Sequence, residues 1–246
     1  MLLSPKTDIG AFRTKDFFSM KHITDIFFDL DHTLWDFDAN SVLAFDKIFK
    51  EQHPTIDTHA FIEIYAPINQ ACWKLYQVDK ITHEELRYQR LKQSFDAMNY
   101  SISDEAIHQI AHDYIEFLPE NNQLFDGAID VLEYLSPRYK LHIITNGFAA
   151  VQEKKIKNSG LAPYFKTITN SEMAGVKKPH RNIFEFALSL AEVEKENALM
   201  IGDCIEADVR GALDFGMQAI LFDEKKNHPT GDVLVISQLT ELKNIL

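Results

Sequence analysis

The chain has 246 residues, of which 46% are hydrophobic, so it can bury a full core as one domain or as one domain carrying an insertion. Its 37 acidic and 25 basic residues give a formal net charge of -12, which argues against nucleic acid and anionic membranes as partners. No apolar stretch reaches the roughly 18 residues of a membrane span, and Cys72 and Cys204 are too few for a disulfide framework. We therefore expect a cytosolic protein with two free thiols that is a monomer or a weak homodimer.

The first half of the chain is predicted to be largely helical. Residues 1–19 carry no clear hydrophobic period and are expected to be a loosely attached N-terminal extension. The unbroken apolar run "DIFFDL" at residues 25–30 then predicts a buried strand. From about residue 38 to 119, apolar residues recur at spacings of three and four, as in amphipathic helices. The segments "SVLAFDKIFKEQ", "HAFIEIYAPINQACWKLYQ", "HEELRYQRLKQSFDAM" and "DEAIHQIAHDYIEFL" predict about four helices.

From about residue 125 onward, short apolar runs alternate with charged or amphipathic segments. The runs "LHIIT", "FKTIT", "ALMIG" and "QAILF" predict buried strands, and the alternation predicts a parallel sheet with helices on both faces. The opening strand belongs with this set. We therefore predict an α/β protein, a Rossmann-like three-layer core of residues 20–37 and 120–246, interrupted by a helical cap of residues 38–119. Segments near residues 36–40 and 119–126 are expected to act as hinges.

Polar residues follow the ends of the predicted strands, where ligands bind in open α/β sheets. The candidates after strands are Asp29, Asp31, Thr33, Thr145, Asn146, Asp203 and Asp208. Lys178 joins them from the segment "GVKKPHRNIF", in which a helix is predicted to begin at Pro179. Because the carboxyl ends of parallel strands meet at one edge, these side chains are expected to lie together.

Carboxylates, hydroxyls and a lysine at one edge fit phosphoryl transfer through an aspartyl-phosphate. A carboxylate attacks a phosphate only if a cation reduces their repulsion, and a hard oxygen ligand set favours Mg²⁺. Asp29 is expected to be both nucleophile and Mg²⁺ ligand. Asp31 is expected to bind Mg²⁺ through its backbone carbonyl and to act as general acid and base through its side chain. Asp203 is expected to complete the ligand set.

The remaining candidates are expected to bind or support the phosphate. Thr145 and Asn146 would hold its equatorial oxygens, and Lys178 would balance charge on the nucleophile and the phosphate. Asp208 is expected behind the metal ligands, although a charge role at a helix N-terminus is equally open. Thr33 has a supporting role, or serves only as a helix cap or turn hydroxyl.

Four stretches carry a resemblance to a known family. "DLDHT", "ITN", "KKP" and "GDCIEAD" resemble the four ordered motifs of the haloacid dehalogenase superfamily, between about residues 22 and 222, and the helical segment resembles its α-helical cap. Within it, "FFDLDHTLWDF" and "GDCIEADVRGALDFGMQAI" are similar to the 5′-nucleotidase-like branch that acts on pyrimidine nucleoside monophosphates. The resemblance implies the same roles for Asp29, Asp31, Thr145, Lys178 and Asp203. One departure is visible, because His180 and Arg181 stand where many relatives have Asp-Pro.

Other functions of the same fold stay open at this point. A phosphomutase of the β-phosphoglucomutase type would keep all four motifs and differ in how the cap excludes water. A 2-haloacid dehalogenase does not need a carboxylate two residues after its nucleophile, so Asp31 argues against one. A non-catalytic binding module would be expected to lack one of the reacting residues.

Several aromatic residues near the candidate site have two readings. Trp35 is expected to shape the pocket because it follows the first motif closely. Tyr65, Trp73 and Tyr76 are expected to be core rather than a surface that stacks a base. The side chain of His32 is expected to point away from that of the preceding aspartate, since neighbours in a strand alternate.

Overall fold

The computed structural model describes residues 20–228 and 233–246, so the predicted extension of residues 1–19 lies outside the described residues. Six strands form one parallel sheet in the order β3-β2-β1-β4-β5-β6. The strands are β1 (Asp25–Phe28), β2 (Lys140–Thr145), β3 (Phe165–Asn170), β4 (Ala198–Gly202), β5 (Gln218–Phe222) and β6 (Leu234–Ile236). The predicted parallel sheet is confirmed, and β6 is an additional strand at its edge.

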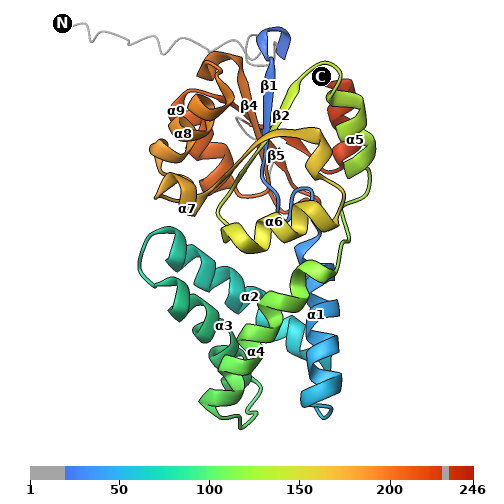
Figure 1. Cartoon of the computed structure of the whole chain (residues 1–246), viewed down its shortest axis with the longest axis vertical. Coiled ribbons are helices and arrows are strands. Elements are labelled where there is room, and N and C mark those ends of the chain that lie inside the picture. Colours follow the sequence, from blue (N-terminus) through green and yellow to red (C-terminus); the bar gives the residue numbers. More distant parts are fainter. Residues whose placement is uncertain (1–19, 229–232) are drawn as a thin grey trace, which may run out of the picture.

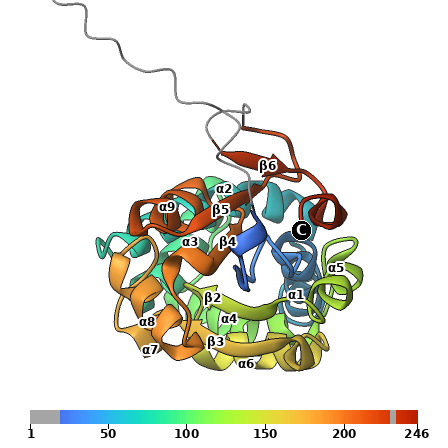
Figure 2. The same cartoon turned by 90° about the horizontal axis from the view of Figure 1, so that it is seen from above.

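Helices cover both faces of this sheet (Figures 1 and 2). Successive residues of β1 enter different cores, because side chains alternate along a strand. Ile26 and Phe28 join a cluster with residues of α5 and α6, whereas Phe27 joins a cluster with residues of α8 and α9. The helices of this half are α5 (Ala128–Leu135), α6 (Ala149–Asn158), α7 (Ser171–Ala174), α8 (Arg181–Ala191) and α9 (Gly211–Phe215). This is the three-layer α/β arrangement expected from the sequence.

The four helices that follow β1 lie together at one end of the molecule (Figure 1). We call them the helical insert: α1 (Phe37–Gln52), α2 (Thr58–Gln77), α3 (His83–Ala97) and α4 (Asp104–Phe117). Each begins at a residue whose side chain accepts a hydrogen bond from a backbone N–H three residues later, as N-caps do. These caps are Asp36, Asp57, Thr82 and Ser103. The number of helices agrees with the sequence pattern.

The helical insert has an aromatic core of its own. Phe45 of α1 lies 4.9 Å from Phe61, 4.9 Å from Tyr65 and 4.4 Å from Tyr114, measured between ring centroids. All four side chains are buried. Aromatic pairs at these distances add to the free energy already gained by burial. These contacts join α1, α2 and α4 within the insert.

Two segments join the insert to the sheet, and they lie side by side. The backbone N–H of Asp36 donates to the carbonyl of Gln123 at 3.1 Å, and that of Phe125 donates to the carbonyl of Leu34 at 3.0 Å. The Asn40 side chain also pairs with the Gln123 backbone, donating at 2.8 Å and accepting at 2.9 Å. The two predicted hinge segments are thus hydrogen-bonded to each other.

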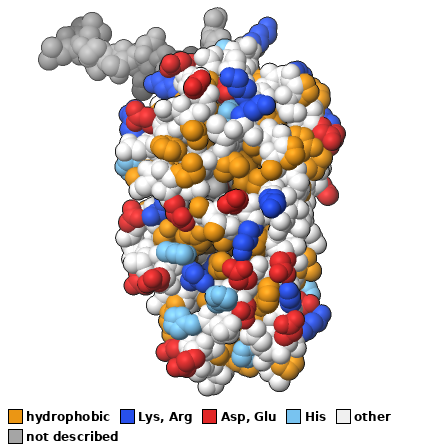
Figure 3. Space-filling model, viewed as in Figure 1, with side chains coloured by type: hydrophobic (Ala, Val, Ile, Leu, Met, Phe, Trp, Pro, Cys, Tyr) orange, Lys and Arg blue, Asp and Glu red, His pale blue; other side chains and the backbone are white. Residues whose placement is uncertain are grey.

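Short helical turns complete the described chain. They are Met20–His22, Leu118–Glu120, Ala162–Tyr164, Lys195–Asn197, Leu239–Asn244 and a π-helical turn at Ile205–Arg210. None of the helices in the described ranges is long and apolar enough to cross a membrane. Acidic and basic side chains are interspersed over the face in Figure 3, so the net negative charge is not concentrated in one patch there.

Candidate active site

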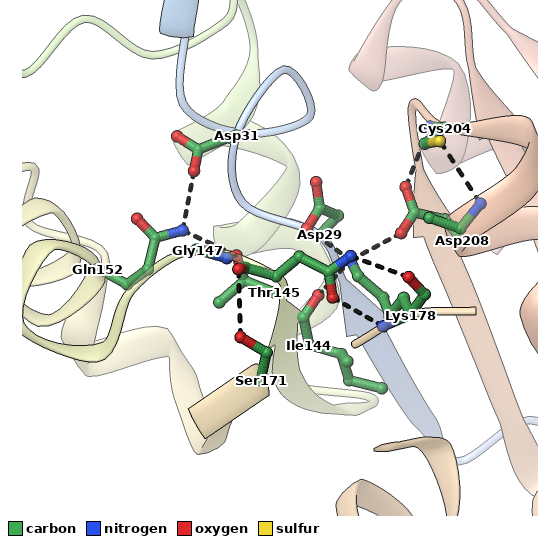
Figure 4. Close-up of polar contacts among 12 residues, drawn as sticks. Asp29, Asp31, Ile144, Thr145, Gly147, Gln152, Ser171, Lys178, Cys204 and Asp208 are labelled. Atoms are coloured by element: carbon green, nitrogen blue, oxygen red, sulfur yellow. Dashed lines mark hydrogen bonds and ion pairs between the residues drawn. The ribbon is translucent and has the colours of Figure 1, made fainter. Parts of the chain in front are cut away.

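A buried lysine connects three segments at the carboxyl edge of the sheet (Figure 4). The Lys178 ammonium lies 2.7 Å from an Asp29 carboxylate oxygen, 2.6 Å from an Asp208 carboxylate oxygen and 2.7 Å from the Ile144 carbonyl. Asp29 and the Ile144 carbonyl accept hydrogen bonds from the ammonium, and Asp208 lies beside it as an ion-pair partner. Asp29 directly follows β1, and Ile144 lies in β2. Lys178 therefore fixes the position of Asp29 relative to the neighbouring strand.

The charges in this group strongly influence one another. Burial alone would lower the pKa of Lys178, but the two carboxylates outweigh burial and raise it above its usual value. Burial raises the pKa of Asp29 to about 7, with Lys178 opposing and Asp208 adding to the effect. The lysine stays charged, and the carboxylates hold more negative charge than one lysine compensates.

Asp208 approaches the sheet closely because residue 202 is a glycine. A Cβ at Gly202 would lie 2.3 Å from a carboxylate oxygen of Asp208, which no side chain would tolerate. The backbone N–H of Cys204 donates to the same carboxylate at 3.0 Å. Asp208 lies in the π-helical turn and pairs directly with Lys178, so it is not a residue whose only task is to sit at a helix N-terminus.

The three carboxylates form a group that fits a divalent cation. Asp29, Asp203 and Asp208 each offer an oxygen, and these oxygens lie within 4.8 Å of one another. Burial, reinforced by Asp208 and Asp29, raises the pKa of Asp203 well above its usual value. A site that makes carboxylates hard to ionise favours a bound cation, and oxygen ligands are those that Mg²⁺ prefers. Asp208, expected behind the metal ligands or at a helix N-terminus, also offers an oxygen to this group.

Thr145 is held by two donors at the end of β2. Its hydroxyl oxygen accepts from the Gly147 backbone N–H at 3.1 Å and from the Gln152 side-chain amide at 2.7 Å. Both lone pairs are then occupied, so the hydroxyl hydrogen remains available to donate. A Cβ at Gly147 would lie 2.3 Å from Gln152, so a glycine is needed for this contact.

Asn146 has contacts that the sequence did not suggest, while its expected contact with a phosphate oxygen stays a prediction. Its amide nitrogen donates to the Lys178 carbonyl at 3.0 Å, and its amide oxygen accepts from the Lys178 N–H at 2.7 Å. The side chain therefore positions the lysine segment. The helix after Lys178 also begins later than predicted, at Arg181 rather than Pro179, because His180 is its N-cap.

Asp31 faces away from the other aspartates, and its contacts were not foreseen (Figure 4). One carboxylate oxygen lies 2.6 Å from the Lys155 ammonium, and the other accepts from Gln152 at 2.8 Å. Lys155 is 2% exposed and lies 4.1 Å from the Trp35 ring centroid. Gln152 donates to both Asp31 and Thr145, so α6 joins the two strand ends.

Three residues near the first motif also differ from what their positions suggested. Thr33 is buried in a turn, is not the N-cap of α1, and has no hydrogen-bond partner for its hydroxyl among the described residues. Trp35 is fully buried beneath Lys155 and does not line the cavity. His32 does line it, because a φ of 63° turns the backbone and ends the strand alternation.

A cavity of about 660 Å³ lies between the strand ends and the helical insert. The sheet contributes Asp29, Asp31 and Thr145 to its wall, and α2 contributes Tyr65 and Trp73. This volume lies within the range of small-molecule sites. Tyr65 is buried as predicted, whereas Trp73 is only partly buried and faces the cavity.

Phe148 makes the contact between the insert and the loop that follows β2. Its ring stacks on Trp73 with centroids 5.6 Å apart, and it also contacts Tyr76 and His83 at 5.8 and 3.8 Å. Phe148 follows Gly147 directly, so this loop touches the insert on one side and the reacting edge on the other. Tyr76 therefore belongs to this contact rather than to the core of the insert.

Comparison with known proteins agrees with this geometry. A family model described as haloacid dehalogenase-like hydrolase matches residues 25–216. The chain belongs to this family. Pyrimidine 5′-nucleotidase PynA of Streptococcus pneumoniae is 34% identical over 231 residues, which cover 90% of this chain and 96% of that protein. Pyrimidine 5′-nucleotidase YjjG of Escherichia coli is 30% identical, with coverage of 90% and 96%.

A solved structure of this hydrolase family matches the whole architecture. The crystal structure of the hydrolase YfnB from Bacillus subtilis, bound to magnesium, superposes with a TM-score of 0.81. It is 30% identical and covers 91% of this chain and 98% of that one. The match includes the helical insert as well as the sheet, because so little of either chain is left out.

Proposed function

We propose that this family member is a Mg²⁺-dependent phosphomonoester hydrolase that acts through an aspartyl-phosphate on Asp29. The observation that carries the proposal is the position of Asp29, which contacts Lys178 and lies within 4.8 Å of Asp203 and Asp208 at the floor of a cavity. Asp29, Asp203 and Asp208 would hold the cation, with the Asp31 backbone carbonyl beside them. When bound, Mg²⁺ would neutralise charge on the carboxylates and on the phosphate.

In the first step, a carboxylate oxygen of Asp29 attacks phosphorus and the bond to the ester oxygen breaks. Lys178 orients the attacking carboxylate of Asp29, because Asp208 and the Ile144 carbonyl hold its ammonium in place. The free hydroxyl hydrogen of Thr145 donates to an equatorial phosphate oxygen, since both of its lone pairs are occupied. The leaving oxygen takes a proton from Asp31.

In the second step, Asp31 takes a proton from water as the water oxygen attacks phosphorus. The bond from phosphorus to Asp29 breaks, inorganic phosphate leaves and the Asp29 carboxylate is regenerated. Lys155 and Gln152 hold both oxygens of Asp31 on the α6 side, so these steps require Asp31 to turn toward the cavity that it lines. Gln152 also contacts Thr145, and this turn is therefore coupled to the hydroxyl that binds phosphate.

The proposed substrates are pyrimidine nucleoside 5′-monophosphates. Two relatives above 90% coverage of their own length carry the name pyrimidine 5′-nucleotidase, and the cavity has room for a base and a sugar beyond the phosphate. We further propose that the helical insert acts as a cap that closes on the paired linkers, as the interdomain movement of the YfnB crystal structure suggests. Cys72 and Cys204 are both free thiols, in keeping with a cytosolic enzyme.

The test is phosphate release from UMP, CMP, AMP, ribose 5-phosphate and an aryl phosphate, with Mg²⁺ and with a chelator. We expect Mg²⁺-dependent release that is greatest with the pyrimidine nucleotides, and no release by Asp29→Asn. Asp130→Asn is the matched control, because Asp130 is exposed and, within residues 20–228 and 233–246, pairs only with Lys243.

Each part of the proposal has its own contrary result. Activity in Asp29→Asn would remove Asp29 as the nucleophile, and activity in chelator would remove the metal. Equal activity on all the esters of the panel would support a phosphatase and exclude a preference for pyrimidine nucleotides. Interconversion of sugar phosphates without net phosphate release would replace the hydrolase by a phosphomutase.

A further inference from the structure

One face of α2 is turned toward the cavity that contains the reacting aspartate. Tyr65, Asn69, Trp73 and Gln77 line this cavity and are spaced four residues apart, so they lie on one side of the helix. Asp29 lines the same cavity from the sheet. A molecule whose phosphate reaches Asp29 can therefore extend its other end to α2.

Asn69 is the polar residue of this face whose orientation is determined by its neighbours. Its side-chain oxygen accepts from Arg90 at 3.1 Å and from the Tyr65 hydroxyl at 3.3 Å. A guanidinium group has only donors, so the atom of Asn69 that faces Arg90 must be the oxygen and not the nitrogen. The amide group therefore cannot turn over without losing its contact with Arg90, since the Tyr65 hydroxyl can accept as well as donate.

Arg90 is itself held firmly. It is 2% exposed, and its guanidinium carbon lies 5.0 Å from the Tyr114 ring centroid and 6.0 Å from that of Tyr65. Cations over aromatic faces at such distances are attracted to them. Arg90 thus acts through Asn69 as a positioning residue within the insert.

The amino group of Asn69 is left without a protein acceptor. Neither of its hydrogens is bonded to any residue of the described chain, although Asn69 is only 5% exposed. The Asn69 amino nitrogen is not sealed from solvent, and Asn69 lines the cavity, so the amino group can be reached from the cavity. A buried donor without an acceptor costs free energy, and a ligand that supplies an acceptor recovers it.

We infer that the Asn69 amino group donates a hydrogen bond to a ring carbonyl of the pyrimidine base of the substrate. Tyr65 and Trp73 lie one turn of α2 on either side of Asn69, so aromatic surface flanks the donor. A pyrimidine is a flat ring with a carbonyl next to its glycosidic bond, and this carbonyl is shared by uracil and cytosine. The inference rests on the proposed nucleotide substrate and assigns the residue that recognises its base.

The test compares two substrates that differ by the base, UMP and ribose 5-phosphate. Asn69→Asp keeps the shape and an oxygen facing Arg90 but replaces the donor by an acceptor. We expect the ratio of kcat/KM for UMP to that for ribose 5-phosphate to fall about tenfold. The fall should come from KM, since the contact is remote from the reacting phosphate. Gln93→Glu, an equivalent amide-to-carboxylate change at an exposed residue of α3 outside the cavity, should leave this ratio in place.

A second pair of variants tests the orientation of the amide. Arg90→Met removes the donor that fixes the Asn69 oxygen and should lower the same ratio, whereas Arg90→Lys keeps a group that only donates and should restore most of it. Thermal unfolding of each variant shows whether the insert has stayed folded. If the ratio of the kcat/KM values falls in proportion to the melting temperature, and not with the loss of the hydrogen-bond donor at residue 90, the inference is overturned.

The outcomes separate this inference from the proposed function. If the wild type prefers UMP and Asn69→Asp keeps that preference, the nucleotidase stands and Asn69 is not the base contact. If Gln93→Glu lowers the ratio equally, the effect is added negative charge on the insert and the inference fails. If the wild type hydrolyses ribose 5-phosphate as well as UMP, the base is not recognised, and both the nucleotide preference and the inference are wrong.

Discussion

Replacing Asp29 by asparagine should stabilise the metal-free protein while abolishing turnover. Burial raises the pKa of Asp29 from its usual 3.8 to about 7, so the folded protein holds this proton more tightly than the unfolded chain. Between these two values the folded state binds more protons, and stability therefore falls as the pH rises. Above pH 7 the folded protein bears the full free-energy cost of holding Asp29 ionised.

The size of the effect follows from the two pKa values. A difference of about 3 pKa units at 1.36 kcal/mol for each unit corresponds to about 4 kcal/mol above pH 7. Asparagine cannot ionise and avoids this penalty, while Lys178 keeps Asp208 as a counter-charge and the Ile144 carbonyl as an acceptor. We expect Asp29→Asn to gain up to about 4 kcal/mol at pH 8, or roughly 10 °C in melting temperature for a chain of this size. At pH 5 the gain should shrink to about 2 kcal/mol.

The assay is thermal and urea unfolding in chelator at pH 5 and pH 8. Asp130→Asn, which removes an exposed carboxylate, should change the unfolding free energy by less than about 1 kcal/mol at either pH. Adding Mg²⁺ should narrow the difference in unfolding free energy between Asp29→Asn and the wild type. A cation that binds more tightly to the wild type stabilises the wild type more. An Asp29→Asn variant no more stable than the wild type at pH 8 in chelator would refute the reasoning.

Three further changes test the same group of residues. Lys178→Met leaves Asp29 and Asp208 buried without a counter-charge and should lower the unfolding free energy in urea by about 3–5 kcal/mol; a loss below about 1 kcal/mol would contradict the buried pairing. Gly202→Ala places a methyl group against the Asp208 carboxylate and should lower kcat for phosphate release at least about tenfold; an unchanged kcat would show that Asp208 can shift freely. Asp203→Asn should raise the Mg²⁺ concentration for half-maximal activity more than about tenfold, and an unchanged requirement would exclude it as a ligand.

The strands other than β6 could be located in the sequence, mostly because each contains apolar residues followed by polar ones at its end. Strands of a parallel sheet are buried on both sides, so their sequences are apolar throughout and their ends are easy to locate. The positions of Asp29, Thr145 and Asp203 at one edge follow from that alone. The edge strand β6 has only three residues, too few for a pattern to appear.

The contacts of Asp31 could not be predicted, because their partners lie on a helix far along the chain. The segment of α6, "AAVQEKKIKN", has the charged composition of a solvent-exposed helix, yet Gln152 and Lys155 on it are buried. Their spacing of three residues, with Val151 and Ile156 on the same side, was the available signal. Asn146 illustrates a second limit, since an amide suits a phosphate oxygen and a backbone peptide group equally well.

The single ammonium of Lys178 has a consequence for how activity can be lost in descendants of this protein. It joins segments that are 34 and 149 residues away in the chain, so its replacement loosens all of them at once. Substitution of Asp29 instead removes the chemistry and relieves a strained charge balance. Inactive but well-folded descendants that retain the binding cavity should therefore arise far more readily by changes at the nucleophile than at the lysine.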